Sequence, residues 1–333
     1  MRKVLIVTGP GGDAQGWGDM KVTETMCETL NGGDLAAEIA YVVTTDEFLK
    51  AISSRSYDIV WSALYYFSHR EDIIGLGDDN EWVADILDER NIPYIGPNAL
   101  TMKQLIQKYE THRIMHENGV LVPAFTLVAA GDALPDVAYP AFVKPNCESR
   151  SVGISDESVV HNLQEMEQRV RYVHEKLEQA ALIEEYLPGR EYTVLMLGNG
   201  RLQEILPGLV TVDKTHFGRH QILRSDLRGV GLTKISIPTE RVEEAKELTK
   251  KATDALKCWD HVRVDMRVDA RGSLRVMEIN GIPGLKPVKS WSPQIYSLYH
   301  PSEGGPMEEY RSMLHLIVHS ALERYGIRKR TRT

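Results

Sequence analysis

Two segments of alternating polar and apolar residues near the C-terminal end predict a β-hairpin. They cover residues 263–269 and 274–280, and Arg271-Gly272 between them suits a tight two-residue loop. With that loop, Asp265 lies opposite Glu278, and Arg263 lies opposite Asn280. These four side chains then share one face of the hairpin. The residues expected on the other face are Val264, Met266, Met277 and Ile279.

The facing carboxylates of Asp265 and Glu278 predict a metal site. Like charges directly opposite each other repel, and their side chains would start only ~5 Å apart. A hard divalent cation would offset that repulsion, because oxygen ligands of this kind suit Mg²⁺. The alternative is an ordinary exposed hairpin with scattered charges, since a one-residue slip in register would separate the two carboxylates.

Bulk properties limit the classes of function. A length of 333 residues is enough for two or three domains, and a net charge of −8 argues against a nucleic-acid partner. The short basic segment 328–332 reads as a solvated end. No apolar run approaches the roughly 20 residues needed to cross a bilayer. Three widely spaced cysteines indicate no disulfide framework, so we expect a cytoplasmic protein without a membrane partner.

The order of predicted elements indicates three regions. Strands and helices alternate over the first hundred residues, which predicts a parallel α/β sheet. One helix is expected from Ala99 to Asn118, with Gly119 as its C-terminal cap. Leu187-Pro188-Gly189 marks a turn and a hinge. The expected domains are residues 1–97, 98–186 and 187–333. The other expected elements are strands at 4–7, 37–43, 57–64 and 93–95, and helices at 21–30, 46–53, 80–89, 162–180 and 239–257, with a further helix at the C-terminus.

Two further segments suit a nucleotide. The apolar strand ending in Lys144 leads into a loop of small residues, where Ser151 and Gly153 would let backbone amides approach a polyphosphate. The hinge segment could offer Leu187 to an adenine and Glu191 to ribose hydroxyls. Each signal is weak by itself, because an exposed loop or a solvated acidic strand end would look the same. Lys108, on the preceding helix, would by itself be an ordinary surface lysine.

Together and in this order, the segments resemble the D-alanine–D-alanine ligase family of ATP-grasp enzymes. Val143-Lys144-Pro145 with Ser151-Val-Gly153 is similar to the family's phosphate loop, and 183–191 to its adenosine-binding hinge. Arg263-Val-Asp265 and Glu278-Ile-Asn280 with Pro283-Gly284 resemble its metal and oxyanion motifs. The resemblance implies an α/β (α+β) fold of three domains, in which a parallel α/β N-terminal domain precedes two α+β domains that clamp ATP.

The resemblance also implies a chemistry and a set of roles. A carboxylate attacks the γ-phosphate of ATP, and an amine captures the acyl phosphate. Two Mg²⁺ ions, which Mn²⁺ could replace, would be held with Glu278 as the bridging ligand. The implied residues are Lys108, Lys144 and Ser151 for the phosphates; Glu184, Leu187 and Glu191 for adenosine; Asp265, Glu278 and Asn280 for the metals; and Arg263 with the Gly284 amide for the oxyanion.

This sequence departs from the family pattern only on the substrate side. The first glycine-rich loop, residues 9–17, lacks the family's glutamate, and Asp13, Asp19 and Glu24 are the candidates to replace it. In the lid, residues 213–224, Arg224 falls near the position of the family's γ-phosphate lysine; the alternatives there are Lys214, His216 and Arg219. The added cations Arg150, Lys286 and Lys289, the last beside Ser290, suggest a substrate with an extra carboxylate or a peptide-like anion.

These departures favour an ATP-dependent ligase of small molecules with a changed substrate pair. Three alternatives stay open: a genuine D-alanine–D-alanine ligase, an ATP-dependent intramolecular cyclase, and a nucleotide-binding module without catalysis. The family resemblance further suggests a homodimer.

Overall fold

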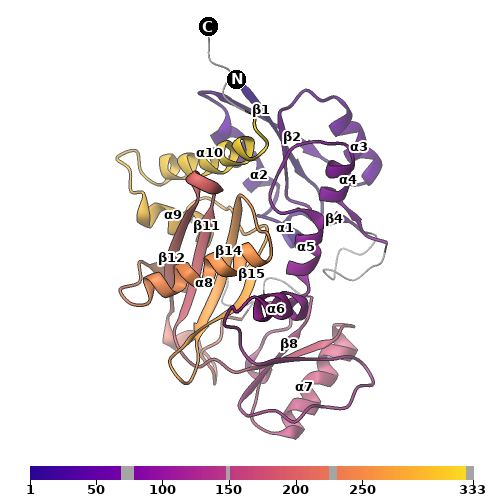
Figure 1. The fold of residues 1–333 in the computed structure, drawn as a ribbon, viewed down its shortest axis with the longest axis vertical. Helices are drawn as coiled ribbons and strands as arrows, with labels where there is room; N and C mark the ends of the chain where they lie inside the picture. The colour runs from indigo at the N-terminus through magenta and orange to yellow at the C-terminus, as the bar shows by residue number, and fades with distance from the viewer. Residues whose placement is uncertain (69–78, 148–150, 225–230, 328–333) are drawn as a thin grey trace.

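The structure is a computed structural model that describes residues 1–68, 79–147, 151–224 and 231–327. Three main sheets follow one another along the chain, and Figure 1 shows them arranged from the N-terminal sheet, through the C-terminal sheet, to a small central-region sheet at the opposite end. No helix of the described residues is long and apolar enough to span a membrane.

The N-terminal sheet is parallel, as the sequence predicts. Its strands run in the order β2-β1-β3-β6, so that the first strand lies inside the sheet. Buried Val4 and Ile6 on β1 show why an apolar first strand belongs there. The expected helix at 80–89 is shorter than predicted, because its first residues pair in a two-stranded ribbon. The elements are β1 Arg2–Thr8, α1 Gly12–Gln15, α2 Met20–Leu30, β2 Leu35–Tyr41, α3 Thr45–Ser53, β3 Ile59–Ser62, β4 Tyr66–Phe67, β5 Glu81–Trp82, α4 Val83–Glu89 and β6 Tyr94–Ile95.

The expected helix from Ala99 to Asn118 is two helices. The chain leaves helical geometry at Gln107, which separates α5 (Ala99–Ile106) from α6 (Lys108–Glu117). Asn146, just after the strand β8 (Ala141–Pro145), caps the first turn of α6. Its carbonyl accepts the Lys108 N–H at 3.0 Å, and its side-chain oxygen accepts the Tyr109 N–H at 2.9 Å. The prediction of one helix was wrong because this cap comes from a residue distant in the sequence. Lys108 is therefore held beside the end of the strand that carries Lys144.

The central sheet is antiparallel, in the order β7-β10-β8-β9, with α7 packed on one face. Its apolar core lies between that face and the helix, and includes Val143, Val170 and Ile183. The opposite face of this sheet lines the pocket that is described below. The elements are β7 Phe125–Val128, β8 Ala141–Pro145, the 3₁₀ turn η1 Asp156–Ser158, β9 Val159–Val160, α7 Leu163–Lys176 and β10 Ala181–Glu185.

The C-terminal sheet has the order β13-β12-β11-β14-β15 and is antiparallel throughout. No helix was predicted between Asn280 and the C-terminal helix, so α9 is an additional element that the sequence did not reveal. The elements are β11 Glu191–Leu197, η2 Gly200–Leu202, β12 Glu204–Val212, η3 Lys214–His216, β13 Thr233–Ser236, α8 Val242–Ala255, β14 His261–Val268, β15 Leu274–Asn280, α9 Trp291–Tyr299 and α10 Pro306–Arg324.

The hairpin of β14 and β15 has the predicted register at the site and a different one beyond it. Arg263 pairs with Asn280 and Asp265 with Glu278, but Met266 pairs with Val276. Met277 is thus the extra residue of a β-bulge, and the loop is longer than two residues. The bulge puts Val276 into the core, while Met277 lines the pocket beside Glu278. The predictions of a two-residue loop and of Met277 on the core face were wrong.

The first and last parts of the chain share one core. Apolar residues of β1 and α2 pack with α10 and with the C-terminal sheet, and fully buried Tyr310 and Met313 belong to this cluster. Figure 1 shows α10 beside α2 against the N-terminal sheet. Residues of the first and third predicted regions therefore pack against each other in this core. The boundaries 1–97, 98–186 and 187–333 stay a prediction.

Candidate nucleotide and metal site

A pocket lies between the central sheet and the C-terminal sheet. It holds about 870 Å³ of space including its open mouth, which is within the range of sites for ligands of nucleotide size. Residues from β8, β10, β14 and β15 face it together, although they are far apart in the sequence. Predicted site residues that line it are Lys108, Lys144, Ser151, Glu184, Leu187, Glu191, Asp265 and Glu278.

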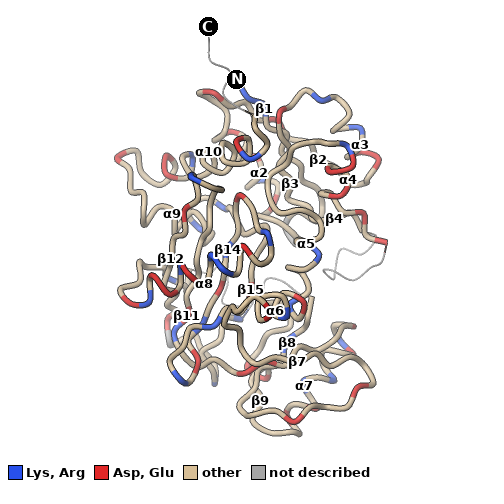
Figure 2. The backbone as a smooth tube through the Cα atoms, viewed as in Figure 1, with Lys and Arg blue, Asp and Glu red and all other residues tan. Residues whose placement is uncertain are grey.

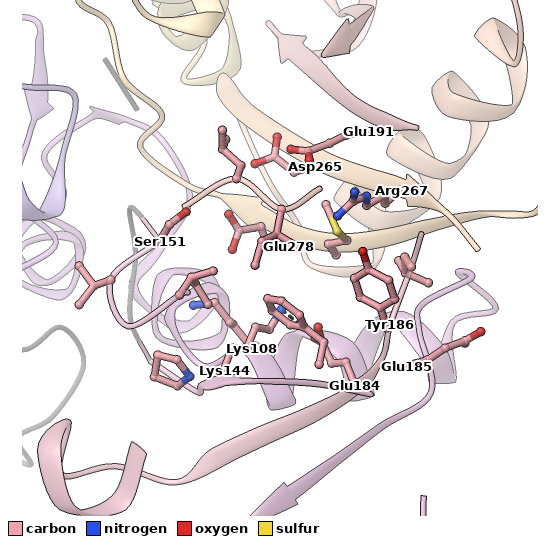
Figure 3. Close-up of a pocket in the computed structure, with 18 residues that line it drawn as sticks. Lys108, Lys144, Ser151, Glu184, Glu185, Tyr186, Glu191, Asp265, Arg267 and Glu278 are labelled. Atoms are coloured by element: carbon pink, nitrogen blue, oxygen red, sulfur yellow. Dashed lines mark ion pairs between the residues drawn. The ribbon is translucent and has the colours of Figure 1, made fainter. Parts of the chain in front are cut away.

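Opposite charges face each other across this pocket. Figure 3 shows Asp265 and Glu278 on the C-terminal sheet, with Lys108 and Lys144 on the other side of the space. Asp265 and Glu278 are direct partners across the β14–β15 ladder, so both carboxylates start from one face. A polyphosphate between the two walls would meet lysines on one side and cation-binding carboxylates on the other.

The carboxylate of Asp265 is fixed by three neighbours. Arg263 donates two hydrogen bonds to it, at 2.9 and 2.8 Å, and the Thr193 hydroxyl donates one at 2.7 Å. Asn280 donates from Nδ2 at 3.0 Å. Burial acts to lower the pKa of Arg263, but the charge and hydrogen bonds of Asp265 outweigh it and raise that pKa. The Arg263 guanidinium therefore stays charged, and its two hydrogen bonds hold the Asp265 carboxylate in a fixed orientation.

These residues fit a magnesium site by their chemistry. Asp265 and Glu278 supply anionic oxygens, and Asn280 supplies an amide whose oxygen and nitrogen exchange places by a flip of the side chain. An all-oxygen set of this kind is what Mg²⁺ prefers. The sequence missed Thr193, on the neighbouring strand β11, because nothing in its local pattern marks it as a partner of Asp265.

On the opposite wall, Glu184 holds Lys144 in place. Its Oε1 lies 2.8 Å from the Lys144 ammonium and 2.8 Å from His112 Nε2, and all three side chains are buried. Burial alone would raise the pKa of Glu184, but the nearby Lys144 and His112 outweigh that effect and lower the pKa to about 2. The Glu184 carboxylate thus orients the phosphate-facing lysine, and its contact with adenosine stays a prediction. His112 was not predicted, since a histidine on a helix face gives no signal of such a role.

The hinge and the lid meet at Arg267, which was not among the predicted site residues. Its Nε donates to the carbonyl of Gly189 at 2.9 Å, and its Nη2 donates to the Gln221 carbonyl. It lines the pocket, as do Ile222 and Leu223 of the lid. The alternation of Arg263, Asp265 and Arg267 could have revealed it. The predicted adenine contact Leu187 is buried beside this hinge.

The lid residue Arg224 contacts the central region at Asp156. Its Nη1 is 3.6 Å from Asp156 Oδ1, and Asp156 also accepts the backbone N–H of Arg219 at 2.8 Å. His216 is exposed, so it makes no wall of the pocket. The role of Arg224 at the γ-phosphate stays a prediction, and the structure places its guanidinium at the edge of the central region.

The loop after Asn280 meets the first glycine-rich loop. The Leu285 N–H donates to the Trp17 carbonyl at 3.0 Å, and a Cβ placed on Gly284 would lie 2.9 Å from the Ser290 hydroxyl. Nearby, the Tyr65 hydroxyl accepts the Ile282 N–H at 3.2 Å.

Around this loop the predicted substrate residues differ in their surroundings. Lys286 and Lys289 are exposed, whereas Ser290 accepts the Lys286 N–H at 3.0 Å. Arg150 lies outside the described residues. Of the candidates for the missing glutamate, Asp19 caps α2 and Glu24 is exposed.

Comparison with known proteins agrees with this geometry. The family model described as D-ala D-ala ligase C-terminus matches residues 129–297. The chain is 31% identical over 214 residues to an uncharacterized protein, y4sG, of Sinorhizobium fredii; the match covers 61% of each chain. It is 27% identical over 254 residues to a D-alanine–D-alanine ligase of Thermoanaerobacter sp., and covers 73% of this chain and 67% of that one.

Solved structures share the fold. A D-alanine–D-alanine ligase from Bacillus anthracis, complexed with ATP, superposes with a TM-score of 0.73 at 19% identity, over 98% of this chain and 99% of the other. The VanG D-Ala:D-Ser ligase from Enterococcus faecalis does so with a TM-score of 0.68 at 17% identity, over 96% and 99%.

These matches settle the class: this is a mixed α/β chain with the ATP-grasp fold. It belongs to the D-alanine–D-alanine ligase-like ATP-grasp family, whose members are ATP-dependent carbon–nitrogen ligases. The family resemblance read from the sequence is confirmed.

Proposed function

We propose that this protein is an ATP-dependent carboxylate–amine ligase that joins two small molecules, amino acids or an amino acid and a peptide-like amine. The observation that carries the proposal is the pairing of Asp265 with Glu278 across the ladder, opposite Lys108 and Lys144 in one pocket. Phosphoryl transfer needs positioning and charge neutralisation more than covalent help from the protein, and this pocket supplies both.

The reaction would proceed in two displacements. An oxygen of the donor carboxylate attacks the γ-phosphorus of ATP, the bond to the bridging oxygen breaks, and ADP leaves. The acceptor amine then attacks the acyl carbon of the resulting acyl phosphate, inorganic phosphate leaves, and a proton is lost from nitrogen.

Each residue has a place in this scheme. Lys108 and Lys144 bind phosphate oxygens, and Glu184 keeps Lys144 aimed at them. Ser151, with φ of +59°, lies in the loop whose backbone amides would approach the polyphosphate. Asp265, Glu278 and Asn280 would hold Mg²⁺, which neutralises phosphate charge when bound. Other oxygen-preferring ions such as Mn²⁺ would suit the same donors.

The oxyanion that forms at the acyl carbon needs donors of its own. Arg263 keeps its charge in the buried site, and its guanidinium stacks 5.0 Å from the centre of the Trp291 ring. We assign it to that oxyanion together with the backbone amide of Gly284. Leu187 and Glu191 would hold adenosine at the hinge side of the pocket.

The substrate pair is proposed to differ from two D-alanines. The supporting observation is the exposed Lys289, beside Ser290 and close in sequence to Gly284, together with the divergent first loop. A cation at this position suits an acceptor with a carboxylate or a peptide-like anion. A genuine D-alanine–D-alanine ligase is the second candidate, and it is the activity that the Thermoanaerobacter relative carries in its name. We further propose a cytoplasmic homodimer.

The experiment is ADP release with Mg-ATP against pairwise mixtures of D- and L-amino acids, with products weighed by mass spectrometry. A pair that releases ADP and yields a product lighter than the summed substrates by one water establishes the ligase. Activity with D-alanine alone supports the second candidate. ATP binding without ADP release from any pair points instead to a tethered or larger substrate, or to a binding module.

A further inference from the structure

Outside the ATP pocket, two histidines and an aspartate converge where the C-terminal helix meets the N-terminal sheet. His315 and His319 lie one turn apart on α10, and Asp34 lies directly before β2. One ligand atom from each of the three side chains can be chosen so that all lie within 4.8 Å of one another. None of the three lines the ATP pocket. This group is called the His–His–Asp cluster below.

The separation of its atoms suits a transition-metal ion. His319 Nε2 lies 3.4 Å from Asp34 Oδ1. That distance is long for a charge-assisted hydrogen bond, which is normally about 2.7–2.9 Å. Two ligands of a tetrahedral zinc ion, each about 2.0–2.1 Å from the metal, lie roughly 3.3 Å apart. Small side-chain rotations would bring the third ligand into the same range.

His315 gives an independent indication. Its Nε2 atom is buried, and among the described residues it finds no hydrogen-bond partner. A buried polar atom left in this way commonly marks an unseen water or ion.

The backbone around the cluster is already held in place. The Arg2 N–H donates to the Asp34 carbonyl at 2.7 Å, which anchors the start of β2 to β1. On the other side, buried Leu314 and Val318 pack α10 into the core. The ligands thus come from two rigid elements near opposite ends of the chain, and Figure 1 shows these elements lying together. A site built in this way requires little ordering on binding.

We propose that the His–His–Asp cluster binds one zinc ion, with two imidazole nitrogens, one carboxylate oxygen and an open fourth position. Imidazole with one carboxylate is a donor set that suits Zn²⁺ and does not suit Mg²⁺. The ion ties α10 to the N-terminal sheet and so clamps the first and last parts of the chain. Arg311, one turn before His315, opposes the metal charge, so the Asp34 carboxylate is essential to the site.

The test uses the full-length protein, stripped of metal with a chelator and returned to buffer with excess Mg²⁺ to occupy the carboxylate site. Zinc affinity and stoichiometry are measured by competition with a chromophoric chelator and by elemental analysis. The variants are Asp34→Asn, His315→Ala and His319→Ala, and His116→Ala is the control, since His116 is an exposed histidine on α6.

We expect one zinc per wild-type chain, at least tenfold weaker binding in each cluster variant, and unchanged binding in the control. Zinc should also raise the melting temperature of the wild type and not that of His319→Ala. A cobalt complex should absorb in the visible without a thiolate charge-transfer band, because the proposed ligands contain no sulfur. Equal zinc affinity in wild type and cluster variants, or no zinc bound at all, would overturn the proposal.

If a cluster variant fails to fold, His319→Gln keeps a polar side chain of similar reach and gives the same comparison. The readout is zinc binding, so it does not depend on ligase activity. Loss of activity in a zinc-binding protein would count against the proposed function and not against this site.

Discussion

Two parts of the same site differ in how their side chains are held. The part that faces the phosphates, called the phosphate wall here, lies on paired strands, and the part that faces the substrates lies on loops. Lys144, Glu184, Asp265 and Glu278 sit on strands whose neighbours fix them by ladder pairing. Gly284, Lys289 and the lid lie on loops, and the cations offered there are exposed. Side chains on paired strands have few orientations, whereas loop side chains take theirs from whatever packs around them. Figure 2 adds that acidic and basic residues are interspersed over the molecule, so the clustering at the phosphate wall is local.

This difference suggests a division of labour. The strand-borne half keeps the charges needed for any nucleotide-dependent ligase, and the loop-borne half sets which substrates are joined. The following predictions test that division, from the largest expected effect to the smallest.

The Glu278→Gln substitution should reduce ADP formation by a factor on the order of 100 or more, because the amide lacks the negative charge that holds a divalent cation. Coupled ADP release at saturating Mg-ATP measures the effect, and thermal unfolding checks the fold. Glu243→Gln on the exposed face of α8 is the matched control and should leave the rate unchanged. A rate within a few-fold of wild type would contradict the assignment of Glu278.

The Lys144→Ala substitution should both raise the KM for ATP and destabilise the fold by about 3–5 kcal/mol, because it leaves Glu184 with a buried charge that has lost its main partner. Adding Glu184→Gln should restore much of the stability without restoring ATP binding. Denaturant unfolding and ATP titration of the single and double variants separate the two effects. Recovery of ATP affinity in the double variant would show that Lys144 acts only by neutralising Glu184 and does not contact the nucleotide.

The ion pair of Glu184 should make stability depend on acid pH. Its pKa is about 2 in the folded protein against an ordinary 4.5, so the folded state favours the ionised form. That contribution is present above pH 4.5 and is lost as the pH falls from about 4.5 toward 2. Unfolding free energies at pH 6 and pH 3 should differ less in Glu184→Gln than in wild type. An equal difference in both proteins would assign the acid sensitivity to other carboxylates.

The Lys289→Ala substitution should raise the KM of the acceptor about tenfold and leave the KM of ATP unchanged, since the loss of one charge–charge contact is on the order of 1.4 kcal/mol. Steady-state kinetics with the pair found by the mass-resolved screen measures both constants. Lys246→Ala on α8 controls for general loss of surface charge. Equal effects on both substrates would remove Lys289 from the acceptor site.

The Asp156→Ala substitution should have the smallest effect, a rise of a few-fold in the KM for ATP. Asp156 ties the lid through Arg224 and the Arg219 N–H, and such partly exposed contacts are worth about 0–1 kcal/mol. Limited proteolysis of residues 213–224, with and without Mg-ATP, reports lid ordering. Cleavage as slow in the variant as in wild type would show that these contacts do not hold the lid.

Much of the molecule was predictable because it depends on local periodicity. The alternation of strands and helices along the chain marked the parallel N-terminal sheet. Alternating polar and apolar residues marked the β14–β15 hairpin, and the register of Asp265 with Glu278 followed from that hairpin. The family pattern added the lysines and the hinge residues. The bulge at Met277 was not predictable, because alternating residues in the sequence do not show that one residue of a strand has no partner on the other strand.

Other features depend on residues that meet only in the fold. The break between α5 and α6 is capped by Asn146, and the Glu184 carboxylate finds His112 from a different element. The contact of Arg267 with the Gln221 carbonyl likewise joins a strand to the lid. No window of sequence contains both partners of such a contact, so periodicity and propensity carry no information about it.

The sequence by itself determined most of the strands and helices and which charges lie on one face of a strand, because those properties follow from the period of the backbone. The tertiary structure decided how the charges are used. It set Asp265 against Arg263, Thr193 and Asn280, buried Glu184 between Lys144 and His112, and brought Asp34 to His315 and His319. The strength of an electrostatic contact depends on distance and on burial, and both are properties of the folded chain.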